Sequence, residues 1–180
     1  MPEIEIRPAA AADIPLLITL DHTYSTDHVW QMEFSHPHEA GQVSVNFRQV
    51  RLPRSIRVDY PRPPQALLED WTRLSSLLVA WLDEQPVGYT SLVLDAQIHL
   101  TWVADLVVDR RLRRQGIGSA LVLSAAEWSV AQDSHNLVLE MQPKNYPAIR
   151  LSLKLGFQFC GYNDYYYPNQ EIGIFFRKSF

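Results

Sequence analysis

Arg113-Arg114-Gln115-Gly116-Ile117-Gly118 is the stretch of sequence that decides the fold. It follows an apolar run at 103–108 that is predicted to be a strand, and it precedes a run at 117–132 with helical periodicity. A helix N-terminus after a glycine-containing turn binds anions, because its free backbone N–H groups and the helix dipole both favour negative charge. Two glycines allow close approach of a phosphate, and two arginines add charge-assisted hydrogen bonds. We therefore expect a phosphate-binding turn at 113–119, with a merely solvated turn as the alternative.

Composition is that of an ordinary globular protein. The chain has 180 residues, of which 47% are hydrophobic and 20% are charged, and this length suits one domain with a full core. The net charge of −4 argues against nucleic-acid binding. No apolar run approaches the roughly 20 residues of a membrane span, and the N-terminus is unlike a signal peptide. The lone Cys160 fits a reducing compartment, and we expect it to be an inert core thiol in a cytoplasmic protein.

Periodicity predicts strands and helices in alternation. Strands are expected at 3–7, 29–34, 43–52, 77–82, 87–94, 98–108, 136–141, 158–162 and 171–177. Helices are expected at 66–74, 117–132 and 145–155, and after Asp13, where Leu16, Leu17 and Leu20 would form the apolar stripe. The segment 102–141 should form a right-handed strand–helix–strand crossover. The expected fold class is α/β, with a mixed twisted sheet flanked by helices.

Two motifs resemble those of one enzyme superfamily. The spacing Arg-x-x-Gly-x-Gly from Arg113, directly after 106–109, resembles the acyl-CoA-binding motif of the GNAT N-acetyltransferases. Asn145-Tyr146-Pro147-Ala148-Ile149-Arg150-Leu151, followed by residues 154–157, is similar to the second motif of that family at the expected separation. The segment 156–176 is similar to the end of the streptothricin acetyltransferase-like branch, whose members acetylate an amine of a cationic antibiotic.

The resemblance implies a fold and a cosubstrate. It implies a single GNAT domain over 1–180, with a sheet splayed at the acyl-CoA site and an atypical acceptor-side insertion at about 21–64. The pantetheine arm of acetyl-CoA would pair with the backbone of Leu106, Val107 and Val108. The pyrophosphate would lie on the turn formed by Arg113, Arg114, Gln115, Gly116, Ile117, Gly118 and Ser119. Asn145 and Ala148 would contact the CoA arm from the other side.

The catalytic positions depart from the family pattern. Many members have a strand glutamate where this chain has Trp102 or Ala104, so Asp105 is the candidate base or amine anchor, with a solvated or capping carboxylate as the alternative. A regular strand would turn Asp105 away from Trp102 and Ala104, but the family usually has a bulge here. Ser152 stands where many members have a tyrosine acid.

Tyrosines and histidines are the other candidates for a proton donor, a proton relay or a metal ligand. Tyr162 is a candidate replacement for the missing acid, together with Tyr146 and the tyrosines at 165–167, although packing is the commoner role of such aromatics. His99 could relay a proton, or it could be a surface residue. His36 and His38 lack an evident third ligand, so no metal is expected.

The implied activity is transfer of an acetyl group from acetyl-CoA to a primary amine of a small molecule, an antibiotic or a polyamine-like cation, by direct attack in a ternary complex. Acetylation of a protein N-terminus or lysine is one alternative. A non-catalytic acyl-CoA-binding sensor is another, since Ser152 and the absent strand glutamate both weaken the catalytic pattern. The expected partners are acetyl-CoA and an amine, without nucleic acid or membrane. A homodimer and a monomer are both compatible with the sequence.

Overall fold

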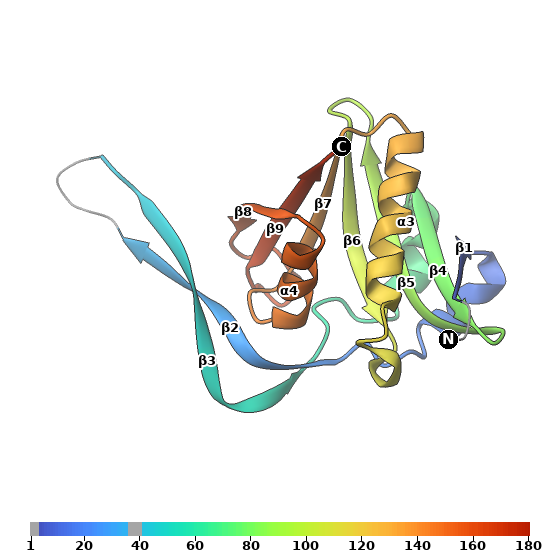
Figure 1. Ribbon diagram of the computed structural model, residues 1–180, viewed down its shortest axis with the longest axis horizontal. Coiled ribbons are helices and arrows are strands. Elements are labelled where there is room, and N and C mark those ends of the chain that lie inside the picture. Colours follow the sequence, from blue (N-terminus) through green and yellow to red (C-terminus); the bar gives the residue numbers. More distant parts are fainter. Residues whose placement is uncertain (1–3, 36–40) are drawn as a thin grey trace.

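The computed structural model describes residues 4–35 and 41–180. Seven strands form one mixed sheet in the order β1-β4-β5-β6-β7-β9-β8, and a two-stranded ribbon, β2-β3, extends away from it (Figure 1). The strands are β1 (Glu5–Pro8), β2 (Tyr24–Ser35), β3 (Ser44–Val58), β4 (Ser76–Leu82), β5 (Gln85–Asp95), β6 (Leu100–Val108), β7 (Asn136–Met141), β8 (Gln158–Asn163) and β9 (Gly173–Ser179). The helices are α1 (Ile14–Leu17), α2 (Ala66–Asp70), α3 (Ile117–Ala131) and α4 (Tyr146–Lys154), with 3-10 turns η1 (Ala11–Asp13), η2 (Trp71–Arg73) and η3 (Arg110–Leu112). The predicted α/β class is confirmed.

Helices cover both faces of the sheet. On one face, α3 and α4 contribute Val122, Ala125 and Ile149 to a core that also contains Leu92 and Leu137 of the sheet. On the other face, the short helices α1 and α2 pack against the strands through a second apolar cluster that comprises Ile14, Leu17, Leu67, Leu77, Val79, Tyr89 and Val107. The layered arrangement buries the apolar side chains of both faces of the central strands.

The parallel crossover is confirmed, and it opens at one end. β6 pairs in parallel with β7 only from Leu100 to Val103, opposite Asn136 to Leu139. β6 also has a bulge, because Leu92 of β5 faces Val103 whereas Ser91 faces Asp105, which leaves Ala104 as the extra residue. Beyond this point β6 and β7 diverge, so the predicted splay of the sheet lies between them (Figure 1).

Several local predictions are corrected. The first helix stops at Leu17, and its buried residues are Ile14 and Leu17, whereas Leu16 is exposed. The strands predicted at 29–34 and 43–52 are longer, because their pairing continues past a bulge near Asp27 to Tyr24 and Val58. The helix predicted at 66–74 is split between α2 and η2.

Cys160 is also a correction, because its thiol is exposed. β8 has a bulge between Phe159 and Gly161, and Cys160 is the extra residue there. A bulged residue leaves the regular pairing of the strand, so the prediction of a core thiol at Cys160 was wrong.

The β2-β3 ribbon is fastened to the domain. The backbone N–H of Trp30 donates to the carbonyl of Pro143, 2.8 Å away, in the segment that joins β7 to α4. The Trp30 ring lies 5.4 Å from the ring of Phe176 and 6.1 Å from that of Phe159, both in the main sheet. The middle of β2 is therefore held against the β7–α4 segment and the strands β8 and β9.

No helix in the described ranges, 4–35 and 41–180, combines the length and the apolar character needed to cross a membrane.

Candidate active site

The turn before α3 has the geometry of an anion site. Gly116 has φ +90° and occupies the N-cap position of α3, where no side chain caps the helix. The first amides of the helix, at 117–119, therefore lack the acceptor that a capping side chain would supply. Arg114 and Gln115 are exposed beside them, whereas the Ile117 side chain is buried in the core and fixes the start of the helix.

Arg113 points inward rather than toward this turn. Its Nε donates to the carbonyl of Val108 at 2.8 Å, and its guanidinium also contacts the carbonyl of Asp21 at 3.3 Å. Burial lowers the pKa of Arg113, but the residue stays cationic in any ordinary buffer. The side chain of Arg113 therefore braces the end of β6, and Arg114 is the arginine left exposed at the turn.

The edge of β6 that faces the splay carries the second part of the site. Leu106 lines the opening, whereas Val107 and Val108 are buried on opposite faces of the sheet. Among the strands that the structure describes, none pairs with this edge beyond Val103. An unpaired strand edge can hydrogen-bond an extended amide-containing chain.

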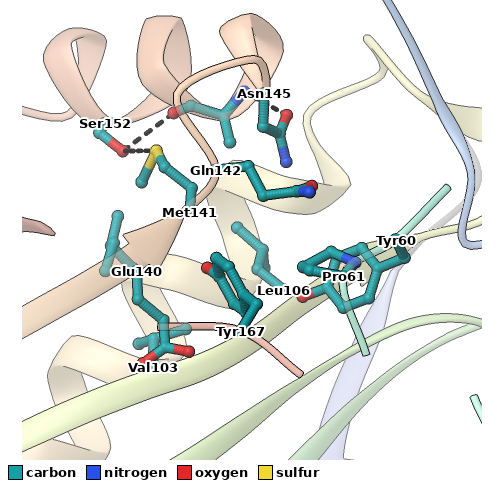
Figure 2. A pocket seen from close by; sticks show the side chains of 12 residues that line it. Tyr60, Pro61, Val103, Leu106, Glu140, Met141, Gln142, Asn145, Ser152 and Tyr167 are labelled. Atoms are coloured by element: carbon teal, nitrogen blue, oxygen red, sulfur yellow. Dashed lines mark hydrogen bonds between the residues drawn. The ribbon is translucent and has the colours of Figure 1, made fainter. Parts of the chain in front are cut away.

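A pocket lies in the splay, and Figure 2 shows its side chains. This splay pocket is bordered by β6, β7, the start of α4 and two loops, and it is lined by Tyr60, Pro61, Val103, Leu106, Leu139, Glu140, Met141, Gln142, Asn145, Ala148, Ser152 and Tyr167. Most of its walls are apolar or aromatic, and Glu140 is the one ionisable carboxylate among the lining residues.

The α4 side of the splay pocket is well ordered by hydrogen bonds. The side-chain oxygen of Asn145 accepts from the backbone N–H of Ala148, 3.2 Å away, and so caps α4. Ser152 is fully buried, and its hydroxyl donates to the carbonyl of Ala148 at 2.9 Å. Because Ser152 already has an acceptor and an alcohol is a weak acid, it does not provide a proton donor equivalent to tyrosine.

A charged cluster crosses the splay. The guanidinium of Arg62 donates to the carboxylate of Glu140, to the carbonyl of Ala104 at 2.8 Å and to Oδ1 of Asp105 at 3.4 Å. It also lies 5.1 Å from the ring centroid of Tyr167. Two carboxylates face one guanidinium, so the cluster of Arg62, Asp105 and Glu140 carries one net negative charge.

Glu140 is the most buried member of this cluster, with 3% of its side chain exposed. Burial raises its pKa above the ordinary value, although the charge of Arg62 and the hydrogen bonds from Tyr166 and Arg62 act in the opposite direction. A carboxylate with a raised pKa is a stronger base than an ordinary one, and such groups are frequent at catalytic sites.

Asp105 lies on the same face of β6 as Trp102, because the bulge at Ala104 reverses the alternation expected of a regular strand. Its Oδ2 accepts from the hydroxyl of Ser91, 2.8 Å away. The side chain is 15% exposed, so a small solute can reach it. The simple capping or solvated role weighed for Asp105 does not describe this setting.

A second cavity adjoins the splay pocket on the α2 face. This α2 pocket is lined by Tyr60, Arg62, Pro63, Pro64, Ala66, Leu67, Asp70, Leu74, Tyr89 and Asp105. Tyr60 borders both cavities, and Asp105 and Glu140 of the charged cluster line one cavity each. The two cavities therefore meet at the cluster, next to Tyr60.

A buried histidine stands behind the α2 pocket. Nδ1 of His22 contacts the carbonyl of Leu20 at 2.7 Å, and Nε2 lies 3.0 Å from the hydroxyl of Tyr89. Because a carbonyl can only accept, Nδ1 carries the proton and Nε2 accepts from Tyr89 in the neutral ring. Burial lowers the pKa of His22, which favours this neutral form.

Other residues singled out in the sequence lie elsewhere. Tyr162 packs its ring 5.6 Å from Phe47 of the ribbon and does not line the splay pocket. The His99 ring stacks on His135, and His99 precedes β6 at the end of the sheet away from the splay. Trp102 packs edge-on against Phe175. His36 and His38 lie outside the described residues.

Comparison with known proteins identifies the family. Residues 46–157 match the profile described as "Acetyltransferase (GNAT) family". The chain belongs to the GNAT acetyltransferase family. It is therefore an acyl-CoA-dependent N-acyltransferase that acts with acetyl-CoA. A comparison with curated protein sequences gave no match.

Solved structures share this GNAT fold. The chain is similar to nourseothricin acetyltransferase, with 22% identity, a TM-score of 0.81 and 98% of each chain covered. It is similar to a putative streptothricin acetyltransferase from Bacillus anthracis str. Ames in complex with acetyl coenzyme A, with 19% identity, a TM-score of 0.77, and 99% of this chain and 100% of that one covered. The ribosomal-protein-S18-alanine N-acetyltransferase from Escherichia coli gives 15% identity, a TM-score of 0.68, and coverages of 98% and 94%.

The GNAT chain has the features that acetyl-CoA requires. The uncapped N-terminus of α3 suits a pyrophosphate, and a Cβ at Gly116 would meet no atom within 4 Å, so the turn is open to a ligand. The unpaired edge of β6 suits the amides of the pantetheine arm. The splay between β6 and β7 leads from this edge to the charged cluster.

Three residues of the charged cluster and its surroundings, Tyr60, Arg62 and Glu140, are not indicated by the sequence motifs, whereas Tyr167 is among the tyrosines considered as acids. Arg62 lies between Pro61 and Pro63, a context that indicates only a break in regular structure. Glu140 did carry a signal, because it is the only charged residue in the otherwise apolar strand β7. A lone carboxylate in a buried strand has to find a cationic or hydrogen-bonding partner.

Proposed function

We propose that this GNAT enzyme transfers the acetyl group of acetyl-CoA to a primary amine of a small cationic molecule, by direct attack in a ternary complex. The observation that carries the proposal is the charged cluster of Arg62, Asp105 and Glu140 at the junction of two small, partly open cavities. Its net negative charge complements an ammonium group.

The donor is proposed to lie along β6 and α3. In this arrangement the amides at 117–119, together with the turn residues Arg114, Gln115 and Gly116, hold the pyrophosphate. Arg113 contributes by bracing β6 from within. The backbone of Leu106, Val107 and Val108 pairs with the pantetheine arm, and Asn145 and Ala148 border it from α4. The thioester then reaches the splay pocket.

The acceptor is proposed to enter through the α2 pocket. Its ammonium group binds Asp105, while the rings of Tyr60 and Tyr89 border the rest of the molecule. Aromatic faces add attraction for a cation. The segment at 21–64, which supplies Tyr60 and the ribbon, forms the acceptor side of a single domain over 1–180.

Glu140 is proposed as the proton acceptor. The amine loses a proton to the Glu140 carboxylate, directly or through water, and the neutral nitrogen attacks the thioester carbonyl. The carbon–sulfur bond then breaks and CoA leaves as the thiolate, while the attached nitrogen loses its second proton to water or to the departing sulfur, which gives the neutral amide. Burial raises the pKa of Tyr60 and Tyr167, so neither phenol is an effective acid. A thiolate with an ordinary pKa near ~8.5 leaves without a strong proton donor.

The named relatives favour one acceptor class. Nourseothricin and streptothricin acetyltransferases act, by their names, on antibiotics, and they are more similar in structure to this chain than the protein-alanine acetyltransferase is. We therefore propose a streptothricin-like or polyamine-like cation as acceptor. The protein acetyltransferase is the second candidate, because that neighbour also shares the fold.

An acceptor panel tests the proposal. Purified enzyme and acetyl-CoA are mixed with streptothricin-class compounds, polyamines, peptides with N-terminal alanine and lysine peptides, and released CoA is measured with a thiol reagent. The enzyme carries Cys160→Ser, because the exposed thiol would otherwise react with the reagent. Small polyamines or antibiotics should accelerate CoA release well above hydrolysis. Preferred acetylation of peptides would support the protein acetyltransferase, and binding of acetyl-CoA without any acceptor-dependent release would support the sensor.

A further inference from the structure

Two histidines and an aspartate gather at the end of the sheet opposite the splay. His99 ends the turn between β5 and β6, whereas Asp133 and His135 belong to the segment between α3 and β7 (Figure 1). The rings of His99 and His135 stack with centroids 4.6 Å apart and an interplanar angle of 9°. Nδ1 of His99 lies 3.3 Å from one carboxylate oxygen of Asp133, and Nε2 of His135 lies 3.8 Å from the other.

The backbone holds these three residues together. The N–H of His135 donates to the carbonyl of His99 at 2.8 Å, and the hydroxyl of Ser134 contacts the same carbonyl at 3.2 Å. The N–H of Phe180 donates to the carbonyl of His135 at 3.0 Å. The cluster is therefore fixed to two turns and to the end of β9, and its geometry does not depend on long flexible side chains.

Two of the three residues adopt a conformation that glycine adopts more easily. Asp133 has φ +58° and follows the C-cap of α3, where the bond from the N–H of Ser134 to the carbonyl of Ser129 completes a Schellman motif. His99 has φ +50° in its turn. Left-handed conformations cost non-glycine residues about 1 kcal/mol or more. Asp and His are among the non-glycine residues that tolerate this conformation best, so the backbone accounts for the residue types, and the further observation is that their side chains face each other.

We propose that His99, Asp133 and His135 form a binding site for a late first-row divalent cation, such as Zn²⁺. The ligand atoms of the three residues all lie within 4.8 Å of one another. Tetrahedral zinc with bonds of about 2.1 Å needs its ligand atoms about 3.4 Å apart, and it lies in the plane of each imidazole that binds it, so the two stacked rings have to turn out of their parallel arrangement to complete the site. Nδ1 of His99 lies 2.9 Å from the carbonyl of Asp133, which can only accept, so His99 binds the cation through Nε2. Imidazole nitrogens favour Zn²⁺, Ni²⁺ or Cu²⁺ over Mg²⁺ and Ca²⁺. Water fills the fourth position.

The site is remote from the acetyl-transfer chemistry, so its role is structural. A bound cation joins the β5–β6 turn to the α3–β7 segment, next to the first residues of the parallel pair, Leu100 and Asn136. A ligand that binds only the folded chain stabilises it by mass action. The cation would thereby stabilise the end at which β6 and β7 are paired, while the two strands stay apart at the splay.

Calorimetric titration of the metal-free full-length chain with ZnCl₂ at neutral pH tests the proposal. We expect one Zn²⁺ per chain, a rise in Tm on adding Zn²⁺, and no binding of Mg²⁺. Asp133→Gly is the most informative variant, because glycine suits φ +58° and the metal-free fold should keep its Tm or gain in Tm. Zn²⁺ affinity should fall at least tenfold in Asp133→Gly and in His135→Ala.

The matched control is the double variant His36→Ala and His38→Ala. It removes two histidines that are close to each other in the sequence but are not part of the proposed site. It should retain wild-type stoichiometry and affinity. The proposal fails if the wild type binds no Zn²⁺, if Asp133→Gly and His135→Ala bind it as tightly as the wild type does, or if the control loses it. Acetyl-CoA turnover is not needed for any of these readouts.

Discussion

The guanidinium of Arg62 donates a hydrogen bond to the buried carboxylate of Glu140 across the open end of the sheet. The two residues are 78 positions apart in the chain. Arg62 also contacts Asp105, so one side chain links the loop after the ribbon to both strands of the splay. Arg62 is therefore the cation that partly neutralises the two carboxylates, Asp105 and Glu140, of the proposed acceptor site.

Replacing Arg62 should therefore destabilise the fold. Arg62→Met leaves the Glu140 carboxylate buried without its cation, and breaking a buried pair in this way costs about 3–5 kcal/mol. Urea denaturation measures the loss. Arg48→Met is the matched control, since Arg48 and Glu33 form an exposed pair that should contribute less than about 1 kcal/mol. Equal effects in the two variants would contradict a structural role for the Arg62–Glu140 pair.

Gly118 tests the proposed pyrophosphate site. A Cβ here would lie 3.4 Å from a methyl carbon of Leu151, an ordinary contact, so Gly118→Ala should fold and keep CoA affinity within a few fold. Gly118→Asp adds a negative charge at the N-terminus of α3 and should weaken CoA binding by more than about tenfold, which corresponds to 1.4 kcal/mol. Calorimetry with CoA compares the two variants. If Gly118→Asp bound CoA as tightly as the wild type does, the pyrophosphate would have to bind at a different place.

Glu140→Gln should lower kcat for the amine by about 10²–10⁴-fold, the range for general acid–base catalysis. Only the ionised carboxylate accepts a proton, and burial raises the pKa of Glu140, so wild-type activity should fall on acidification at a higher pH than an ordinary glutamate would give. That acidic limb should disappear in Glu140→Gln. The defect should shrink at high pH, where the amine deprotonates unaided. A variant with wild-type kcat and the same pH profile would exclude Glu140 as the base.

Asp105→Asn separates binding of the amine from proton transfer. Loss of the anchoring charge should raise KM for the amine, with a smaller change in kcat, while the Kd of CoA stays constant. Kinetics at saturating acetyl-CoA and calorimetry with CoA give both quantities. A fall in kcat as large as that of Glu140→Gln, without a change in KM, would assign the base to Asp105 instead. Weaker CoA binding would make Asp105 structural.

Asp13 provides a test of stability against pH. Burial raises its pKa, but the hydrogen bonds from Arg7 and the N–H of Ala10 and the charge of Arg7 outweigh burial and hold the pKa below its ordinary value. The stabilisation is therefore present above the unfolded pKa of about 3.9 and is lost as pH falls through the lower folded value. Asp13→Asn should reduce Tm at pH 7, and the difference from the wild type should narrow in acid. A constant difference across this range would rule out the ionised pair as its source.

The local parts of the site were predictable from sequence, because they depend on neighbouring residues. The glycine turn, the helix that begins near residue 145 and the crossover all arise from short-range patterns, and the structure confirms them. The Arg62–Glu140 link was not predictable, since a long-range pair requires knowledge of where the sheet opens. The bulge at Ala104 was expected from the family resemblance, whereas the bulge at Cys160 was not, because nothing in the local sequence marks where one extra residue changes the face that the following side chains occupy.

β9 is the last strand that the structure describes in chain order, yet it lies between β7 and β8. Its residues Ile174 and Phe176 are fully buried in the core against the strands made before them. During synthesis from the N-terminus, β7 and β8 therefore wait with unpaired edges until β9 has left the ribosome. Such edges invite pairing with other chains. This end of the sheet is therefore completed last, and a chain in which β9 has not yet docked exposes strand edges through which it can aggregate.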